Sequence, residues 1–233
     1  MWQYLVNLVA DLIRVLYEFT VSLGIPSYAL AILLMTLFIR LILYPLNNKQ
    51  LVSSKKMQEI QPQIAEIQKK YKKSPEIANQ EIIKLYRKHN VNPMSGCLPI
   101  LVQMPIIIAL FQALRLFEYT NVGAAFFWVP HLKDPDPYFI LPLLVGIATY
   151  LQTKLSMMSM PKTTQSNPQA EKFASTQKTM LYVMPIMIGW MSTQFPSGLC
   201  LYWIFYSLTG IIQQMFVNRR PTLQEGKVGG ANE

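Results

Sequence analysis

Five apolar runs constrain this chain more than any other feature, because a membrane-spanning helix needs about 20 predominantly apolar residues. The runs cover residues 25–46, 97–118, 138–156, 180–195 and 199–217. Only 14% of the 233 residues are charged, whereas soluble domains carry about 25%. The pattern predicts an all-α, polytopic membrane protein with five transmembrane helices. It argues against a soluble enzyme, a disordered chain or a disulfide scaffold.

The first 24 residues differ from the apolar runs. Their apolar side chains recur at helical spacing, and Asp11, Arg14 and Glu18 fall among the opposite positions. This predicts an amphipathic interfacial helix over 1–24 that lies on the outer face of the membrane. A basic start followed by a clean apolar core is missing, so the segment is a poor signal peptide. Whether a cleaved leader precedes Met1 stays open.

Lysine and arginine counts predict the orientation, since cytoplasmic loops of membrane proteins are enriched in both. Segment 47–96 carries ten of them, 157–179 carries three and the tail 218–233 carries three. Loop 119–137 carries only Lys133, and the turn 196–198 carries none. The N-terminus is therefore expected outside and the C-terminus in the cytoplasm.

The polar segment 47–96 predicts a cytoplasmic helical hairpin. Met57, Ile60, Ile64, Ile67 and Tyr71 form one helical stripe, and Ala78, Ile82, Leu85 and His89 form another. Between them, Ser74 is a candidate N-cap, Pro75 suits the first helical position and Glu76 suits the first turn. Both stripes are narrow, so we expect a weakly held, mobile hairpin.

The basic residues of the hairpin and tail have two readings. Positive charge alone retains the loop inside, near anionic lipid. The sharper reading adds contact with ribosomal RNA or a nascent chain. Free nucleic acid is not expected as the main ligand, since aromatic stacking residues are nearly absent there. The candidate contacts with ribosome or lipid are Lys69, Lys70, Lys72, Lys73, Arg219 and Arg220.

Arg40 lies inside the first apolar run, where a charge costs at least about 2.5 kcal/mol and usually faces a water-filled cavity. The alternative is that its long side chain reaches the inner headgroups. Other spans also place polar groups in their inner halves, which favours a hydrated groove open to the cytoplasm and closed outside. For the single glutamines, an interhelical hydrogen bond is an equally good reading. The candidate groove residues are Arg40, Thr36, Gln103, Gln152, Trp203, Ser207 and Gln214.

Signs of covalent chemistry are missing from the sequence. All twelve acids lie outside the span interiors, so Arg40 is expected to have no buried carboxylate partner. The same absence argues against a proton-coupled transporter. No phosphate-binding glycine loop occurs. His89 and His131 lack ligand spacing, and Cys97 and Cys200 are expected at opposite membrane faces. We therefore expect no enzyme activity, no metal site and no cofactor.

Several motifs resemble those of YidC-type membrane protein insertases, the bacterial members of the YidC/Oxa/Alb family. They are NPMSGCLP at 92–99, QMPI at 103–106, FPSGL at 195–199, LYW at 201–203 and IQQ at 212–214. Arg40, followed by Tyr44-Pro45-Leu46, is similar to the groove arginine of that family. The resemblance is to the short form without a large periplasmic domain. Where family members often have Asn, this chain has Ser207.

The resemblance implies an insertase and chaperone of the bacterial plasma membrane. Nascent membrane proteins would enter the groove from the cytoplasm and release their apolar segments to lipid, Sec-independently or beside Sec. The implied partners are nascent membrane proteins, the ribosome, components of the Sec translocon and the lipid bilayer. The alternatives are an assembly factor that shields partner helices without inserting them and, less in keeping with the sequence, a small-solute transporter.

Overall fold

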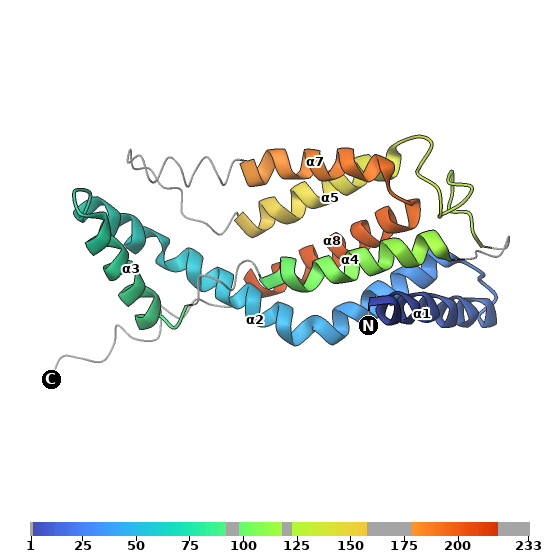
Figure 1. The fold of residues 1–233 in the computed structure, drawn as a ribbon, viewed down its shortest axis with the longest axis horizontal. Coiled ribbons are helices and arrows are strands. Elements are labelled where there is room, and N and C mark those ends of the chain that lie inside the picture. The colour runs from blue at the N-terminus through green and yellow to red at the C-terminus, as the bar shows by residue number, and fades with distance from the viewer. Residues whose placement is uncertain (1, 92–97, 118–122, 158–178, 219–233) are drawn as a thin grey trace.

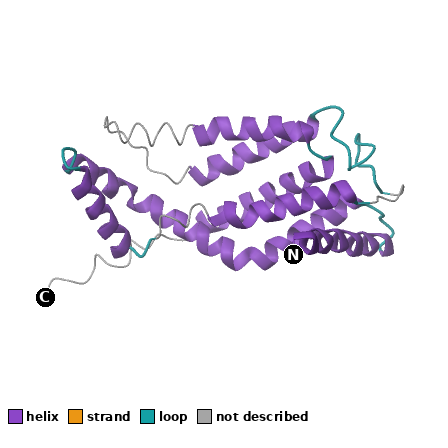
Figure 2. Ribbon diagram, viewed as in Figure 1, coloured by secondary structure: helices purple, strands orange, loops and turns teal. Residues whose placement is uncertain are grey.

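The computed structural model describes residues 2–91, 98–117, 123–157 and 179–218, and over these ranges the chain is helical with no β-strand (Figures 1 and 2). This confirms the predicted all-α class. The α-helices are α1 (Trp2–Ser22), α2 (Tyr28–Lys70), α3 (Pro75–Lys88), α4 (Leu98–Leu116), α5 (Ile140–Met157), α7 (Met184–Met191) and α8 (Ser197–Asn218). A π-helical turn, Thr179–Val183, precedes α7, and a 3-10 turn, Ser192–Gln194, follows it.

Helix α8 is the centre of the bundle, because it packs against both α2 and α5. Helix α7 covers α5 on one side, whereas α1 packs on α2 and α4 on the other (Figure 1). The fully buried side chains gather where α2 and α8 begin and α4 ends; they include Ile32, Met35, Leu110, Leu114, Leu199 and Tyr202. We call this the loop end of the bundle, and the opposite end, from which α3 projects, the hairpin end.

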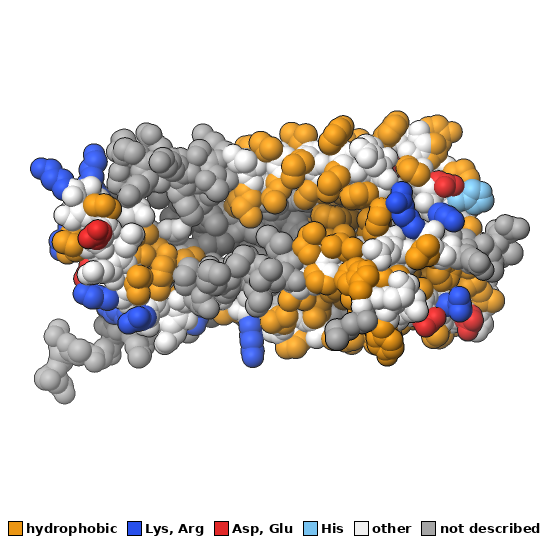
Figure 3. Space-filling model, in the orientation of Figure 1, with side chains coloured by type: hydrophobic (Ala, Val, Ile, Leu, Met, Phe, Trp, Pro, Cys, Tyr) orange, Lys and Arg blue, Asp and Glu red, His pale blue; other side chains and the backbone are white. Residues whose placement is uncertain are grey.

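Three helices of the described residues are long and apolar enough to cross a membrane: α2, α5 and α8. Helix α4 has a shorter apolar stretch, 102–116, and the predicted fourth span consists of the π-helical turn, α7 and the 3-10 turn. The count of five spans and the interfacial position of α1 therefore stay predictions. Orange, hydrophobic side chains cover much of the bundle surface, whereas lysines and arginines lie mainly towards its two ends (Figure 3).

Helix α2 runs without interruption for 43 residues, or about 64 Å at 1.5 Å per residue. It joins the predicted span 25–46 to the first helix of the predicted hairpin, although Pro45 and Pro62 lie inside it. Neither proline ends the helix, and no glycine stands between them to favour a break. The base of the hairpin is thus a direct extension of a membrane helix.

The two predicted stripes of the hairpin face each other. Ile60 and Ile64 of α2 pack with Ile82 and Leu85 of α3, and Val91 completes this small core. Helix α3 begins at Pro75 after the N-cap Ser74, as the sequence predicts, but the Ser74 side chain makes no capping hydrogen bond.

Loop 123–139 closes the loop end of the bundle. The buried Asp136 carboxylate accepts hydrogen bonds from Trp128 Nε1 at 3.1 Å and from the backbone N–H of Leu141 at 2.6 Å. The backbone N–H of Ser197 and its hydroxyl both donate to the carbonyl of Asp134, at 2.9 and 2.7 Å. Ser197 begins α8, so the last two residues of the predicted turn 196–198 belong to the helix.

The small hairpin core supplies a test of how α3 is held. Replacing Ile82 by Ala removes buried methyl groups and should lower the free energy of opening α3 by about 2 kcal/mol. Amide hydrogen exchange across α3 should then be about 30-fold faster. Ile83→Ala is the matched control, because Ile83 is 49% exposed on the same helix. Equal acceleration by both variants would contradict this account.

Candidate functional site

Arg40 lies in the first third of α2, and its guanidinium is held by α8. The Cζ atom lies 3.8 Å from the centroid of the Tyr206 ring, a cation–π contact. Nη1 donates a hydrogen bond to Gln213 Oε1 at 3.2 Å, and Nη2 donates to the backbone carbonyl of Tyr206. One helix therefore supplies a π-face and two acceptor oxygens for a single positive charge.

Gly210 makes room for this arrangement. A Cβ atom at this position would lie 2.7 Å from Arg40 Nη2 and 2.6 Å from Gln152 Nε2. Both distances are shorter than a real Cβ contact allows. The missing side chain therefore lets the polar ends of a residue from α2 and a residue from α5 meet against the backbone of α8.

A polar cavity of about 220 Å³ lies between these three helices. Its polar side chains come from α2, α5 and α8, and those of Gln152, Gln213 and Gln214 lie in the halves of α5 and α8 nearer the hairpin end. The lining residues are Arg40, Asn47, Gln50, Leu51, Ser54, Gln152, Ser156, Tyr206, Gly210, Gln213 and Gln214. On the α2–α8 surface, Arg40 and Gln213 also border a larger and more apolar hollow of about 520 Å³.

Several buried polar atoms around the cavity have no hydrogen-bond partner among the described residues. They include Arg40 Nε, Gln213 Nε2 and Asn47 Nδ2 in the lining, and Ser207 Oγ and Thr149 Oγ1 within one turn of it. Buried polar groups are almost always satisfied by protein or by ordered water. A cluster of this kind favours a cavity that holds water.

The charge of Arg40 is not neutralised by a carboxylate in the described part of the chain. The two ion pairs found there are Arg14–Asp11 and Lys84–Glu81, and both lie elsewhere. A positive charge held by neutral groups attracts a negatively charged or strongly dipolar group that enters the cavity.

The predicted groove residues divide into two sets. Gln152 and Gln214 line the cavity together with Arg40. The other four, Thr36, Gln103, Trp203 and Ser207, are not among its lining residues. Thr36 is buried and donates to the carbonyl of Ile32 at 2.7 Å, and Gln103 Nε2 donates to the Tyr202 hydroxyl at 2.8 Å. Trp203 packs against the core, and Ser207 is fully buried.

The sequence pattern missed several lining residues. Gly210 shares the helical face of Ser207 and Gln214, so it had a signal, but an absent side chain suggested no role. Gln213 directly precedes Gln214, and Tyr206 lies one turn before Gly210. Tyr206 and Gln213 therefore lie on a face of α8 that is rotated from the predicted one. Asn47, Gln50, Ser54 and Ser156 lie beyond the apolar runs or at their very ends, where polar residues carry little signal.

The predicted basic contact residues of the hairpin lie at its tip. Lys69, Lys70, Lys72 and Lys73 are all exposed, at the end of α2 and in the turn to α3 (Figure 1). Arg219 and Arg220 lie outside the described residues.

Gly210 gives a direct test of the cavity. Gly210→Leu should fill it and displace the Arg40 and Gln152 side chains, so a charged thiol reagent should label Ser54→Cys at least several-fold more slowly. All labelling variants also carry Cys97→Ala and Cys200→Ala, so that Ser54→Cys supplies the thiol. Leu208→Phe, on the exposed side of the same helix, should leave the labelling rate unchanged. Unaltered labelling in Gly210→Leu would show that the cavity is not the route to position 54.

Comparison with known proteins assigns the family. The family model described as "60Kd inner membrane protein" matches residues 19–225. A protein of Clostridium perfringens named "Membrane protein insertase YidC" is 45% identical over 225 residues, which cover 95% of this chain and 92% of that protein. A protein of the same name from Oceanobacillus iheyensis is 46% identical over 83% of this chain and 75% of its own length.

A solved structure agrees with these relatives. It is described as "Active YidC insertase crystal structure with the first transmembrane domain resolved", and it matches with a TM-score of 0.62 and 28% sequence identity. The match covers 92% of this chain but 46% of that one, so the chain spans about half the length of the solved protein. From the family match, the relatives and the shared fold, this chain belongs to the family of YidC-type membrane protein insertases.

Proposed function

We propose that this chain inserts nascent membrane proteins into the bacterial inner membrane and uses the cavity around Arg40 as a half-way polar site. The observation that carries the proposal is a positive charge, with no carboxylate partner among the described residues, in a polar cavity between α2, α5 and α8. A short polar segment of the substrate enters from the hairpin end, and Arg40 attracts its acidic groups. The apolar segment that follows moves along the bundle surface into lipid.

The energies favour this route. Water in the cavity lowers the cost of bringing polar backbone into the membrane, which is several kcal/mol for each unpaired group in a dry interior. Burial of the apolar segment in lipid supplies roughly 25 cal/mol per Å² of apolar area. A potential that is positive outside adds about 2.3 kcal/mol per negative charge for each 100 mV. No covalent step is needed.

In the membrane topology that we propose, the hairpin and the C-terminus lie in the cytoplasm and the N-terminus lies outside. The exposed lysines at the hairpin tip then face the ribosome or anionic headgroups, together with Arg219 and Arg220. Helix α1 lies at the outer interface. Components of the Sec translocon are partners for substrates with more than a short translocated segment.

Two other functions use the same fold differently. An assembly factor would bind partner helices on the apolar surface of the bundle and would not need Arg40. A small-solute transporter would need a polar path through the closely packed loop end, where most of the described buried side chains are apolar and the buried Asp136 and Ser197 are engaged in hydrogen bonds. The polar cavity therefore favours insertion.

Crosslinking tests the path of the substrate. The purified chain is placed in liposomes without Sec components, with a photoreactive residue at Gln213, in the cavity, or at Leu208, on the exposed side of α8. A ribosome-bound small membrane protein should crosslink several-fold more strongly from position 213 and give a protease-protected product. Equal crosslinking from both positions, with protection, would support insertion by another path.

Arg40 variants test the electrostatic part of the mechanism. Arg40→Ala should lower insertion of a substrate with an acidic translocated segment several-fold, whereas Arg40→Lys should largely preserve it, because a positive charge remains. A substrate with a neutral translocated segment is the control and should be affected much less. Normal insertion of the acidic substrate by Arg40→Ala would contradict a role for this charge and would favour the assembly factor.

A further inference from the structure

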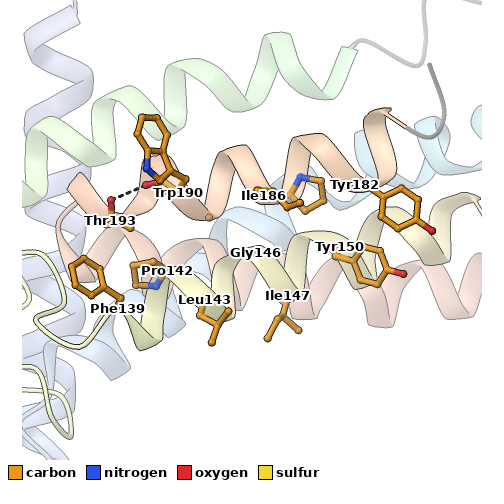
Figure 4. A pocket seen from close by; sticks show the side chains of 12 residues that line it. Phe139, Pro142, Leu143, Gly146, Ile147, Tyr150, Tyr182, Ile186, Trp190 and Thr193 are labelled. Carbon is orange, nitrogen blue, oxygen red and sulfur yellow. Dashed lines mark hydrogen bonds between the residues drawn. The ribbon is translucent and has the colours of Figure 1, made fainter. Parts of the chain in front are cut away.

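A second hollow lies between α5 and α7, on the outside of the bundle. It has a volume of about 480 Å³ and is lined almost entirely by apolar side chains. Figure 4 shows it running along both helices, from Phe139 near one end to Tyr150 and Tyr182 at the other. We call it the α5–α7 groove. It shares no lining residue with the cavity around Arg40.

Two glycines form the floor of this groove. A Cβ atom on Gly189 would lie 3.3 Å from the Cα of Gly146 and 3.3 Å from the carbonyl oxygen of Pro142. The two helices therefore touch backbone to backbone, and the bulky side chains on either side of the contact stand up as walls. Leu143 and Ile186 belong to these walls and are 65% and 72% exposed. Exposed side chains this large and apolar suit a surface that faces lipid.

The dimensions of the groove favour a thin occupant. Its volume of about 480 Å³ is spread along roughly 16 Å, from Phe139 to Tyr150, so the groove is long and narrow. An α-helix with its side chains is about 10 Å wide and would seat only one face there. A single hydrocarbon chain is thin and apolar enough to lie in it.

The end of the groove nearest the hairpin is polar and positively charged. The rings of Tyr150, from α5, and Tyr182, from the π-helical turn that precedes α7, lie 6.0 Å apart. Lys154 lies one turn further along α5, about 6 Å, and its Nζ is 5.7 Å from the centroid of the Tyr150 ring. In the described part of the chain, Lys154 belongs to neither of the two ion pairs. Tyrosine and lysine together are the side chains that mark the headgroup level of a bilayer.

We propose that the α5–α7 groove is a binding site for an anionic phospholipid of the leaflet on the hairpin side. One acyl chain lies over Gly146 and Gly189, and the phosphate lies at Lys154, beside the two tyrosine hydroxyls. A zwitterionic lipid would fill the same groove with its acyl chain but would gain less from Lys154, because its headgroup has no net charge. The site is independent of the proposed substrate path and holds whether or not the chain inserts proteins.

The test uses the purified full chain in phosphatidylcholine liposomes. These contain a trace of phosphatidylglycerol or of phosphatidylcholine, each with the same photoreactive acyl chain, and mass spectrometry identifies the labelled peptides. Phosphatidylglycerol should label the α5 and α7 peptides roughly fivefold more than phosphatidylcholine, the effect of one lysine near an anionic headgroup.

Variants separate the charge from the groove. Lys154→Gln should remove the preference for phosphatidylglycerol, whereas Lys154→Arg and Lys133→Gln, a charge change in the opposite loop, should keep it. Ile147→Trp should reduce labelling by both lipids because it fills the groove. Leu151→Trp is its control: Leu151 has nearly the same exposure, 48% against 46%, but does not line the groove.

Two results would overturn the proposal. One is equal labelling of α5 and α7 by the two lipids, or a preference that Lys154→Gln leaves intact. The other is strong crosslinking of a nascent chain to these peptides with loss of lipid labelling, which would assign the groove to a protein segment.

Discussion

The guanidinium of Arg40 is the constraint around which the hairpin half of the bundle is organised. A charge at this depth is costly, and α8 offsets that cost with the Tyr206 ring, one backbone carbonyl and the Gln213 side chain. This set of contacts requires α2 to lie directly on α8, and Gly210 provides the space. The same glycine admits Gln152 from α5. Three helices thus meet at one charge, and the polar atoms there that lack a hydrogen-bond partner among the described residues favour bound water.

The two ends of the bundle differ in how their buried groups are packed and hydrogen-bonded. At the loop end, close packing of apolar side chains is completed by hydrogen bonds of the connecting loop, with Asp136 satisfied by several donors and Ser197 tied to the Asp134 carbonyl. At the hairpin end, polar side chains border a cavity and several of their atoms lack partners among the described residues. This contrast supports the proposed entry of polar chain from the hairpin end and argues against a continuous aqueous pore.

The sequence predicted the helices well and the site only in part, for physical reasons. Apolar runs report burial in protein or lipid alike, so the ends of α4, α5 and α8 fall within about two residues of the predicted boundaries. For the same reason the runs do not tell which face of α8 points inward, since core and lipid are equally apolar. Of the predicted face, Gly210 and Gln214 line the cavity but Trp203 and Ser207 do not. Tyr206 and Gln213 border the cavity in their place. The sequence also left two roles open for Gln103. Its amide donates a hydrogen bond to the Tyr202 hydroxyl between α4 and α8, which is the interhelical alternative. The continuity of α2 through two prolines had no local signal.

That continuity joins the two polar parts of the molecule. Arg40 and the basic tip of the hairpin lie on one helix, with about 45 Å of helix between Arg40 and Lys70. Asn47, Gln50 and Ser54, which border the cavity, lie on the stretch between them, already beyond the apolar run. The cavity therefore reaches past the apolar part of α2, which supports the proposed access of water to Arg40 from the hairpin end. A partner that binds at the hairpin tip contacts the same helix that carries Arg40. We propose that α3, which only a small apolar core attaches to α2, adjusts to such a partner while α2 fixes its distance from the cavity.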